Sequence, residues 1–475
     1  MNRNYFKTYL FSLFSFGSAL LANAQSTDEI LNLMINDKLI KQTEADSLRA
    51  EAAIKAQETP KDKTLALDLE WRPRTEYRDG YGQLANDTTT PAFYTNQRTR
   101  LSLNYQVEGK INFQFSIQDI RTWGAADPRS TIGTVQVFEA FLEPVITKNF
   151  SIRIGRQRVM LDNQRLFAQN DWRQNGNAFD GVDLRWTAPK LSTDLFTAWN
   201  QTGEGTANNW YLPVNSAGAP IVNFKLLMVH YLKWKINDHF ALTTINCIDG
   251  FQGTTVYTNL YVRGTAGGRI EYTNKAFYAT VSGYYQFGKT QVNTPEISAF
   301  YLQPEIKYIF HEKTTIRFGA EVMSGQDATK TATKSNSFVP LYGVAHRFNG
   351  YMDLYTKFPS DLNNAGLVNP YLFLVQSLTK KTSAGVYLHH FASENNFVNA
   401  KKETISKNLG SEVDLIFNFT PNIATNIEVG YSVYLPTAST VAIKKAAIGS
   451  NDHFQQWAYV MFTYKPQLFK TKFSK

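Results

Sequence analysis

The chain has 475 residues, a formal net charge of +9 at pH 7, a single cysteine and a mean hydropathy of −0.32. So low a hydropathy excludes a helical membrane protein, and the lone Cys247 excludes an internal disulfide framework. The 25 Tyr and 33 Phe residues suit the aromatic girdles of a membrane barrel, although a large carbohydrate-binding β-protein is also rich in Tyr.

Residues 1–24 predict a signal peptide. Arg3 and Lys7 make a basic start, an apolar stretch runs from Leu10 to Leu21, and the small-residue triplet Ala22-Asn23-Ala24 is typical of a cleavage site. We expect the mature chain to begin at Gln25. No later stretch approaches the ~18 consecutive apolar residues of a membrane-spanning helix, so a membrane form of this chain must be a closed β-barrel.

Residues 25–63 predict a periplasmic helical leader and linker. Apolar residues recur at helical spacing from Asp28 to Leu39, and Thr43-Glu44-Ala45-Asp46 resembles a capped start of a second helix that runs to about Gln57. Pro60 and the charged run after it then end this segment. A partly disordered leader is the alternative, because few apolar groups are available for burial.

The segment from Leu65 to Arg78 alternates with period two between apolar and charged residues. Leu65, Leu67, Leu69 and Trp71 fall on one face, and the charged side chains fall on the other. A second segment, Ile111 to Gln118, sets four apolar residues against Asn112, Gln114, Ser116 and Gln118. Burying uncharged polar faces of this kind in a protein core would cost free energy, but they suit strands with lipid outside and water inside.

Strand-like runs recur to the end of the chain, so residues 64–475 predict an all-β fold: a transmembrane antiparallel up-and-down β-barrel of about 18 strands, preceded by the short helical segment. Gln456 to Tyr464 predicts the closing strand, which should pair with the opening strand. Three polar connections, Asp79–Asn96, Gln201–Pro220 and Ser324–Ser337, predict outward loops or lumen plugs. The glycine-rich run Gly264–Gly268 predicts a tight turn.

Cations are distributed unevenly. Between Arg72 and Arg185 the sequence has thirteen Arg but only two Lys, Lys110 and Lys148. A face selected only for solubility should not favour Arg over Lys so strongly. Recognition of planar oxyanions does favour Arg, because guanidinium offers a rigid bidentate fork. We therefore predict an arginine-lined lumen in which Glu70 and Glu76 support the guanidinium groups. Mutual neutralisation of Arg and Glu across neighbouring strands remains the alternative.

Several motifs together resemble the alginate-export family of outer-membrane channels. They are Ile154-Gly155-Arg156-Gln157, Asp162-Asn163-Gln164-Arg165-Leu166, Asp171-Trp172-Arg173-Gln174-Asn175, Phe179-Asp180-Gly181-Val182, Pro340-Leu341-Tyr342-Gly343, Gly350-Tyr351-Met352-Asp353-Leu354 and Gly410-Ser411-Glu412-Val413-Asp414. The resemblance implies an 18-stranded outer-membrane barrel that passes a negatively charged polysaccharide through a constricted, Arg-rich lumen.

The residues expected along the solute path combine the alternating arginines with those that match the family signature. They are Arg72, Arg74, Arg78, Arg98, Arg100, Arg153, Arg156, Arg158, Asp162, Arg165, Arg173, Asp180 and Arg185. We expect a monomeric channel for an acidic, polyuronate-like saccharide in the outer membrane of a Gram-negative-type bacterium. It would lie in lipid, need no cofactor and bind no nucleic acid, with periplasmic accessory proteins as candidate partners.

Three other functions compete with this interpretation. A less selective general porin would share the same barrel, and a soluble secreted β-protein that binds acidic glycans would share the composition. An enzyme is disfavoured, because none of the seven His lies in a recognisable nucleophile motif. His389 and His390 occupy adjacent strand positions that point to opposite faces, which argues against a shared metal.

Overall fold

The computed structural model describes residues 42–56, 62–125, 135–201, 224–252, 259–291 and 294–473, without the side chains of residues 50–56. The expected signal peptide, the expected helix from Asp28 to Leu39 and most of the connection 201–220 lie outside the described residues. The chain divides into two units. The first contains helix α3 (Gln42–Ala56), close to the predicted 43–57, and the second runs from Asp62 to Phe473.

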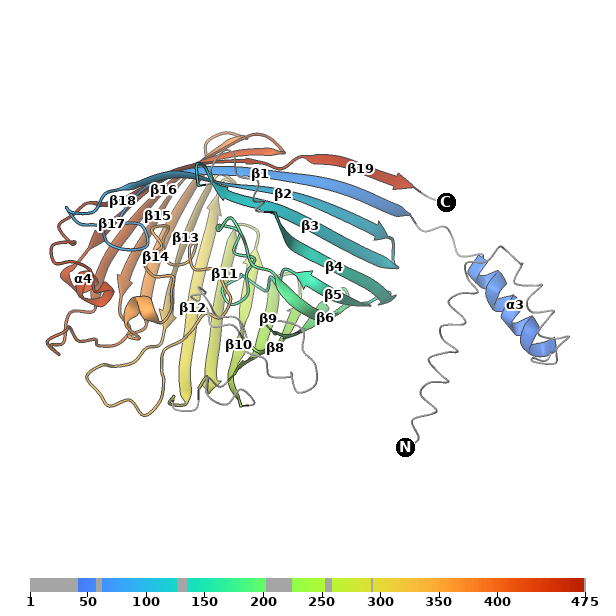
Figure 1. Ribbon diagram of the computed structural model, residues 1–475, viewed down its shortest axis with the longest axis horizontal. Coiled ribbons are helices and arrows are strands. Elements are labelled where there is room, and N and C mark those ends of the chain that lie inside the picture. Colours follow the sequence, from blue (N-terminus) through green and yellow to red (C-terminus); the bar gives the residue numbers. More distant parts are fainter. Residues whose placement is uncertain are drawn as a thin grey trace. The chain divides into compact units, whose positions relative to one another are not determined.

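The second unit is built from strands (Figure 1). Their bounds are β1 (Lys63–Asp79), β2 (Ala92–Val107), β3 (Ile111–Thr122), β4 (Gln136–Thr147), β5 (Phe150–Gln157), β6 (Phe179–Thr187), β7 (Leu191–Trp199), β8 (Leu226–Lys235), β9 (Phe240–Gln252), β10 (Leu260–Asn274), β11 (Phe277–Gly288), β12 (Ile297–Phe310), β13 (Thr314–Met323), β14 (Leu367–Ser377), β15 (Thr382–Ala392), β16 (Asn408–Asn422), β17 (Thr425–Pro436), β18 (Gln455–Tyr464) and β19 (Gln467–Phe473). Two short helices, η2 (Ser360–Leu362) and α4 (Ala438–Lys444), lie in connections. None of the helices in the described part of the chain is long and apolar enough to cross a membrane.

From β1 to β18 each strand pairs antiparallel with the next one along the chain, and β1 pairs with both β2 and β18, which closes the sheet. The segments β18 and β19 pair with successive parts of β1, so they occupy one position in the barrel. They are separated at Lys465-Pro466, where proline has no N–H to offer a neighbouring strand. The barrel therefore has 18 strands, and the predicted closing strand is confirmed.

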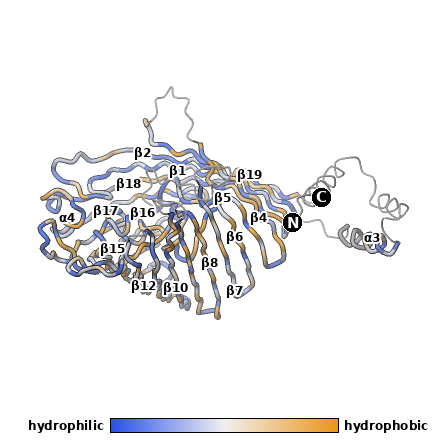
Figure 2. Tube along the Cα trace, turned by 60° about the horizontal axis from the view of Figure 1, so that its bottom comes forward, coloured by the Kyte–Doolittle hydropathy of each residue, from blue (hydrophilic) through white to orange (hydrophobic). Residues whose placement is uncertain are grey.

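Side chains on the strands are arranged inside out relative to a soluble protein. On β1, Glu70, Arg72, Arg74 and Glu76 are buried, while Ile270, Val281 and other large apolar side chains on the strands are exposed. Figure 2 shows the resulting alternation of hydrophilic and hydrophobic residues along the strands. An exposed apolar exterior around a charged interior requires lipid outside and polar groups inside. A soluble glycan-binding protein is thereby excluded.

The connections differ in length at the two ends of the barrel. Those at one end, such as the turns between β2 and β3 and between β14 and β15, have two to four residues, whereas those at the other end are longer. Outer-membrane barrels place short turns on the periplasmic side and long loops outside. The chain enters β1 and leaves β19 at the short-turn end, so both lie on the periplasmic side.

The expected turn at Gly264–Gly268 is wrong, because β10 runs straight through it. The glycines here allow close approach of neighbouring strands. A Cβ at Gly268 would lie 2.2 Å from the carbonyl oxygen of Thr243, and one at Gly264 would lie 2.3 Å from the ring of Phe287. A glycine cluster within a strand can therefore mark tight packing rather than chain reversal.

Replacing the outward Val281 by arginine should destabilise the folded barrel in lipid by about 2–4 kcal/mol, because position 281 lies near the middle of β11 and faces the hydrocarbon. Urea unfolding in phospholipid vesicles measures this cost, with Val281→Leu as the control. Equal stability of the two variants would contradict the assignment of faces.

His453 joins the first and last strands at the outer end of the barrel. Its Nε2 lies 3.1 Å from Asp79 Oδ1 at the end of β1, and its Nδ1 lies 3.0 Å from Asp87 Oδ1. Hydrogen bonds to Asp87 and Asp79 raise the pKa of His453. The contribution of this contact to stability is therefore complete below the unfolded pKa of about 6.5, and it is lost as the pH rises through the raised pKa.

His453→Asn should accordingly lower the urea midpoint most at acidic pH, and the difference from the wild type should shrink as the pH rises. The midpoint measured against pH checks this, with His390→Asn on the outer face as the control. A difference that grows with pH would show that the imidazolium does not stabilise the seam.

Candidate functional site

Two long connections fold into the barrel and narrow its lumen. The first inserted loop, residues 158–178, joins β5 to β6, and the second inserted loop, residues 324–366, joins β13 to β14. Leu166, Phe167, Met352 and Leu354 in these loops are buried. The second inserted loop contains the predicted loop Ser324–Ser337 but is much longer, and its interior position matches the lumen-plug form of that prediction.

The two inserted loops pair with each other inside the lumen. Phe167 and Tyr342 form a parallel bridge, in which Tyr342 N donates to Leu166 O at 2.9 Å and Ala168 N donates to Tyr342 O at 3.3 Å. The bridge brings together the segments around Arg165 and around Tyr342, both of which carry family motifs. The loops therefore form one constriction.

The arginines of β1 and β2 anchor the first inserted loop. Arg98 contacts Glu70 and donates to Asp171 Oδ1 at 2.8 Å, and Arg72 Nη1 donates to Asp171 Oδ2 at 3.3 Å. Arg74 Nη1 donates to the backbone oxygen of Trp172 at 2.8 Å, and its guanidinium lies 3.9 Å from the centre of that ring. Burial alone would raise the pKa of Asp171, but Arg98 and Arg72 hold it well below its ordinary value.

Arg78 and Arg100 belong to the same inward face. Arg78 donates to Glu76 Oε2 at 2.9 Å and lies over the ring of Tyr81. Arg100 donates to Gln118 Oε1 at 2.7 Å and lies over the ring of Phe138. The predicted carboxylates Glu70 and Glu76 thus contact these guanidinium groups, and most of the donors are directed to protein acceptors.

Arg165 fastens the two loops to the wall. Its side chain is fully buried, forms a 2.8 Å ion pair with Glu321 on β13, and donates to Asn349 Oδ1 and to the backbone oxygen of Val344. Asp162, in the same loop, accepts from Arg269 on β10 at 2.7 Å. Neither Glu321 nor Arg269 carried a sequence signal of its own beyond its place in an alternating strand.

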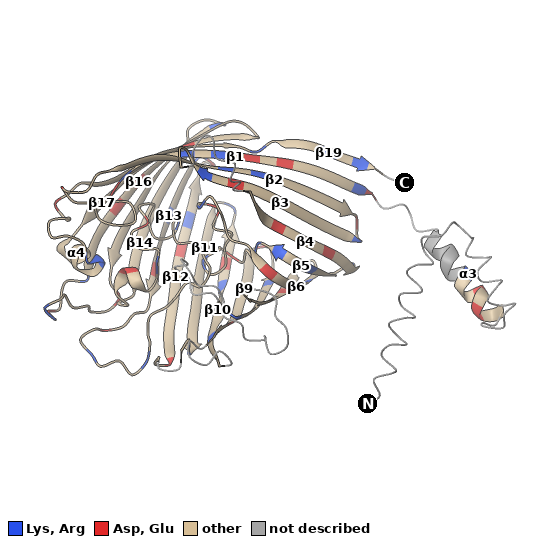
Figure 3. Ribbon diagram, viewed as in Figure 1, with Lys and Arg blue, Asp and Glu red and all other residues tan. Residues whose placement is uncertain are grey.

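A second group of cations lies on β5, β6 and the start of the first inserted loop. Arg153 and Arg185 both contact Glu143, at 2.7 and 2.9 Å, and Arg158 contacts Glu139 at 2.8 Å. These side chains are partly exposed and, with Asp183 and Asp194, border a small hollow of about 120 Å³. Figure 3 shows the charged residues on the strands of this part of the barrel.

Arg156 and Asp180 do not line the lumen, which corrects the sequence prediction for both. They form a 2.7 Å ion pair, with side chains 38% and 67% exposed. On β5 and β6 they share the outward face with Ile154 and Leu184, because side chains alternate along a strand. The motif identified their partnership but not the direction in which they point.

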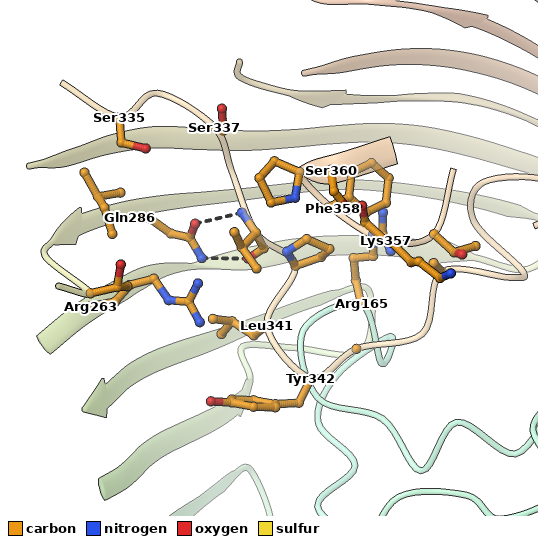
Figure 4. Close-up of a pocket in the computed structure, with 18 of the residues that line it drawn as sticks. Arg165, Arg263, Gln286, Ser335, Ser337, Leu341, Tyr342, Lys357, Phe358 and Ser360 are labelled. Carbon is orange, nitrogen blue, oxygen red and sulfur yellow. Dashed lines mark hydrogen bonds between the residues drawn. The ribbon is translucent and has the colours of Figure 1, made fainter. Parts of the chain in front are cut away.

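A cavity of about 730 Å³ lies between the two inserted loops and the wall from β9 to β12. Its lining mixes the aromatic rings of Tyr342 and Phe358 and the aliphatic side chain of Leu341 with polar groups (Figure 4). Gln286 holds the loop in place, because its amide donates to Val339 O at 2.7 Å and accepts from Val339 N at 2.9 Å.

Four cations border this cavity, and they differ in their contacts. Arg165 and Arg263 are buried and paired with Glu321 and Asp249. Arg173 and Lys357 are exposed, and within the described part of the chain no ion pair joins either side chain to a carboxylate. Sequence reasoning named Arg173 but missed Lys357, which no motif or alternating pattern had marked.

A closed 18-stranded barrel with an apolar exterior and a charged lumen narrowed by inserted loops defines an outer-membrane channel. The family described as alginate export matches residues 63–442, which is most of the chain. The protein therefore belongs to the alginate export family, as the motifs indicated. It is a monomeric, non-enzymatic channel that lies in the lipid of a Gram-negative outer membrane.

Solved structures share this fold. OccAB4 of Acinetobacter baumannii is 13% identical, with a TM-score of 0.55 over 88% of this chain and 99% of that one. OccK3 (OpdO) of Pseudomonas aeruginosa is 11% identical, with a TM-score of 0.56 over 85% and 96%. The outer membrane protein OpdK of Pseudomonas aeruginosa is 12% identical, with a TM-score of 0.54 over 86% and 99%. A comparison with curated proteins found no match.

Arg165→Met should destabilise the protein by about 3–5 kcal/mol, because Glu321 would remain charged and buried without its partner. The double variant Arg165→Met/Glu321→Gln should recover part of that loss. Urea unfolding checks both, with Arg156→Met as the control, because its half-exposed pair with Asp180 is worth at most about 1 kcal/mol. Similar costs for Arg165→Met and Arg156→Met would contradict the anchoring role of Arg165.

Proposed function

We propose that this channel passes an acidic saccharide, of the polyuronate type, through the narrowed lumen. The observation that carries the proposal is the 730 Å³ cavity bordered by Arg173 and Lys357, two cations without a carboxylate partner in the described structure. Most other lumen cations are neutralised by protein carboxylates. A free guanidinium and a free ammonium in a narrow passage attract anions and oppose cations.

The lining suits a sugar. Flat apolar surfaces such as the ring of Tyr342 and Phe358 can cover the faces of a pyranose, while Ser335, Ser337 and Gln286 offer polar groups to its edges. The volume lies within the range of about 300–1,000 Å³ that small-molecule sites occupy. We infer that a short stretch of an acidic saccharide, a few sugar units at a time, occupies the cavity.

The predicted path residues take different parts in this proposal. Arg173 would bind the carboxylates of the solute, because its planar fork suits them. Arg153, Arg158 and Arg185 border the small hollow beside the first inserted loop and would add to the positive field there. Arg72, Arg74, Arg78, Arg98, Arg100, Arg165 and Asp162 would act by holding the constriction in shape.

The rest of the chain fits a secreted channel. We propose that residues 1–24 act as a signal peptide and that residues 25–63 form a periplasmic leader, because the chain enters β1 at the short-turn end of the barrel. Periplasmic accessory proteins would meet the channel on that side.

Single-channel recording in planar bilayers tests the function. An acidic oligouronate should block the current of the wild type, whereas a neutral oligosaccharide of equal length should block it less. The double variant Arg173→Gln/Lys357→Gln should weaken block by the oligouronate by about tenfold or more, since a hydrogen bond to a charged group is worth about 1.5–3 kcal/mol. The effect should be largest at low ionic strength, where screening is weakest.

Lys380→Gln is the matched control, because Lys380 is an exposed cation in the short turn between β14 and β15, at the opposite end of the barrel. It should leave the block unchanged. Equal block of the wild type by acidic and neutral oligosaccharides would overturn the proposal and favour a general porin.

A further inference from the structure

Two carboxylates lie side by side on the inward face of β16. Glu412 and Asp414 are two residues apart and are 1% and 0% exposed. Directly across from Asp414 on β17 is Ser432, which is also fully buried. All three side chains lie on the lumen side, because side chains at alternate positions share a face. They form a compact cluster of oxygen atoms, here called the Glu412 cluster.

Oxygen atoms of the Glu412 cluster lack partners. Glu412 Oε2, both carboxylate oxygens of Asp414 and the hydroxyl oxygen of Ser432 are buried and form no hydrogen bond of normal geometry, although Ser432, Glu412 and the backbone of Tyr351 lie near Asp414. Other lumen carboxylates differ in this respect, because Glu76, Asp249 and Glu321 each contact an arginine. Across the residues that the structure describes, no ion pair joins Glu412 or Asp414 to a cation.

The second inserted loop covers the cluster. Met352 N donates to Glu412 Oε1 at 2.8 Å, and the neighbouring Gly350 has a φ of +79°. A Cβ at Gly350 would lie 2.5 Å from Glu412 Oε1, so only glycine permits the loop to approach so closely. The turn therefore seals two adjacent acids away from bulk water, and their charges would repel each other without a neutralising group.

We propose that the Glu412 cluster binds a divalent cation, Ca²⁺, between the barrel wall and the second inserted loop. Ca²⁺ takes oxygen ligands from carboxylates, hydroxyls, backbone carbonyls and water. The described residues include no group of three or more His, Cys, Asp or Glu side chains arranged around a metal. Glu412, Asp414 and Ser432 offer only oxygen atoms, which suit a hard cation such as Ca²⁺.

The ion has a structural consequence. It neutralises the cluster and ties the wall strands β16 and β17 to the turn at Gly350–Met352. That turn precedes Asp353, which accepts from His346 at 2.8 Å, and His346 in turn stacks on Trp172 of the first inserted loop at 4.0 Å. Binding at the cluster thus steadies the constriction formed by both loops. This inference does not depend on the identity of the solute.

Direct binding to the intact wild-type protein is the first test. After removal of divalent ions with chelator, equilibrium dialysis with radioactive Ca²⁺ should show about one ion bound per chain at millimolar concentration or below, the range of extracellular sites. Tb³⁺ should bind in its place and show emission sensitised by Trp457, the strand partner of Ser432. The absence of saturable Ca²⁺ binding would overturn the proposal and leave a shared proton as the group that neutralises the two acids.

Asp414→Asn tests the location of the ion. It keeps the shape of the side chain, so the variant should still fold and show heat-modifiable migration, but it should lose Ca²⁺ binding and the rise in melting temperature that Ca²⁺ gives the wild type. Asp183→Asn is the matched control, because Asp183 is another inward carboxylate with an unpartnered buried oxygen, on β6 near Arg185. If both variants lost Ca²⁺ binding, or if both kept it, a site at the Glu412 cluster would be refuted.

Discussion

Lipid offers no hydrogen-bond partner to the backbone, and this constraint determines the rest of the structure. Each strand must pair on both edges, so the sheet has to close where β1 meets β18. Closure leaves one face of every strand toward hydrocarbon and the other toward the lumen. Charged residues near the middle of the membrane are therefore favoured inside, which explains why the arginines of β1 and β2 gather there with their carboxylates.

A lumen lined with charges must satisfy them, and the inserted loops supply many of the partners. Asp171 and the backbone carbonyls of the first inserted loop accept from Arg72, Arg74 and Arg98, and Asn349 of the second accepts from Arg165. The same contacts that satisfy the wall position the constriction. Arg173 and Lys357, which form no ion pair within the described structure, are the contacts that we propose for an anionic solute.

The Glu412 cluster is the acidic counterpart of this arrangement. Where arginines and loop oxygens meet on β1 and β2, the charges cancel within the protein. Where two acids meet a loop turn on β16, no side chain cancels them, and a cation from outside can do so. Arg165 of the first inserted loop joins Asn349 of the second inserted loop to Glu321 on the wall. The proposed ion would join the neighbouring turn at Gly350–Met352 to β16.

The sequence by itself determined the barrel, its closing strand and the faces of β1, because a period-two pattern records directly which side chains meet lipid, and chain length predicted about 18 strands. It also pointed to the arginines as functional candidates, because Arg greatly outnumbers Lys between Arg72 and Arg185. Only the tertiary structure decided what those arginines contact, since Asp171 and Gln174 lie about a hundred residues away from Arg72 along the chain. It also placed Arg156 and Asp180 outside and Gly264–Gly268 within a strand, because motif and glycine content do not specify the direction of a side chain or the distance to a neighbouring strand.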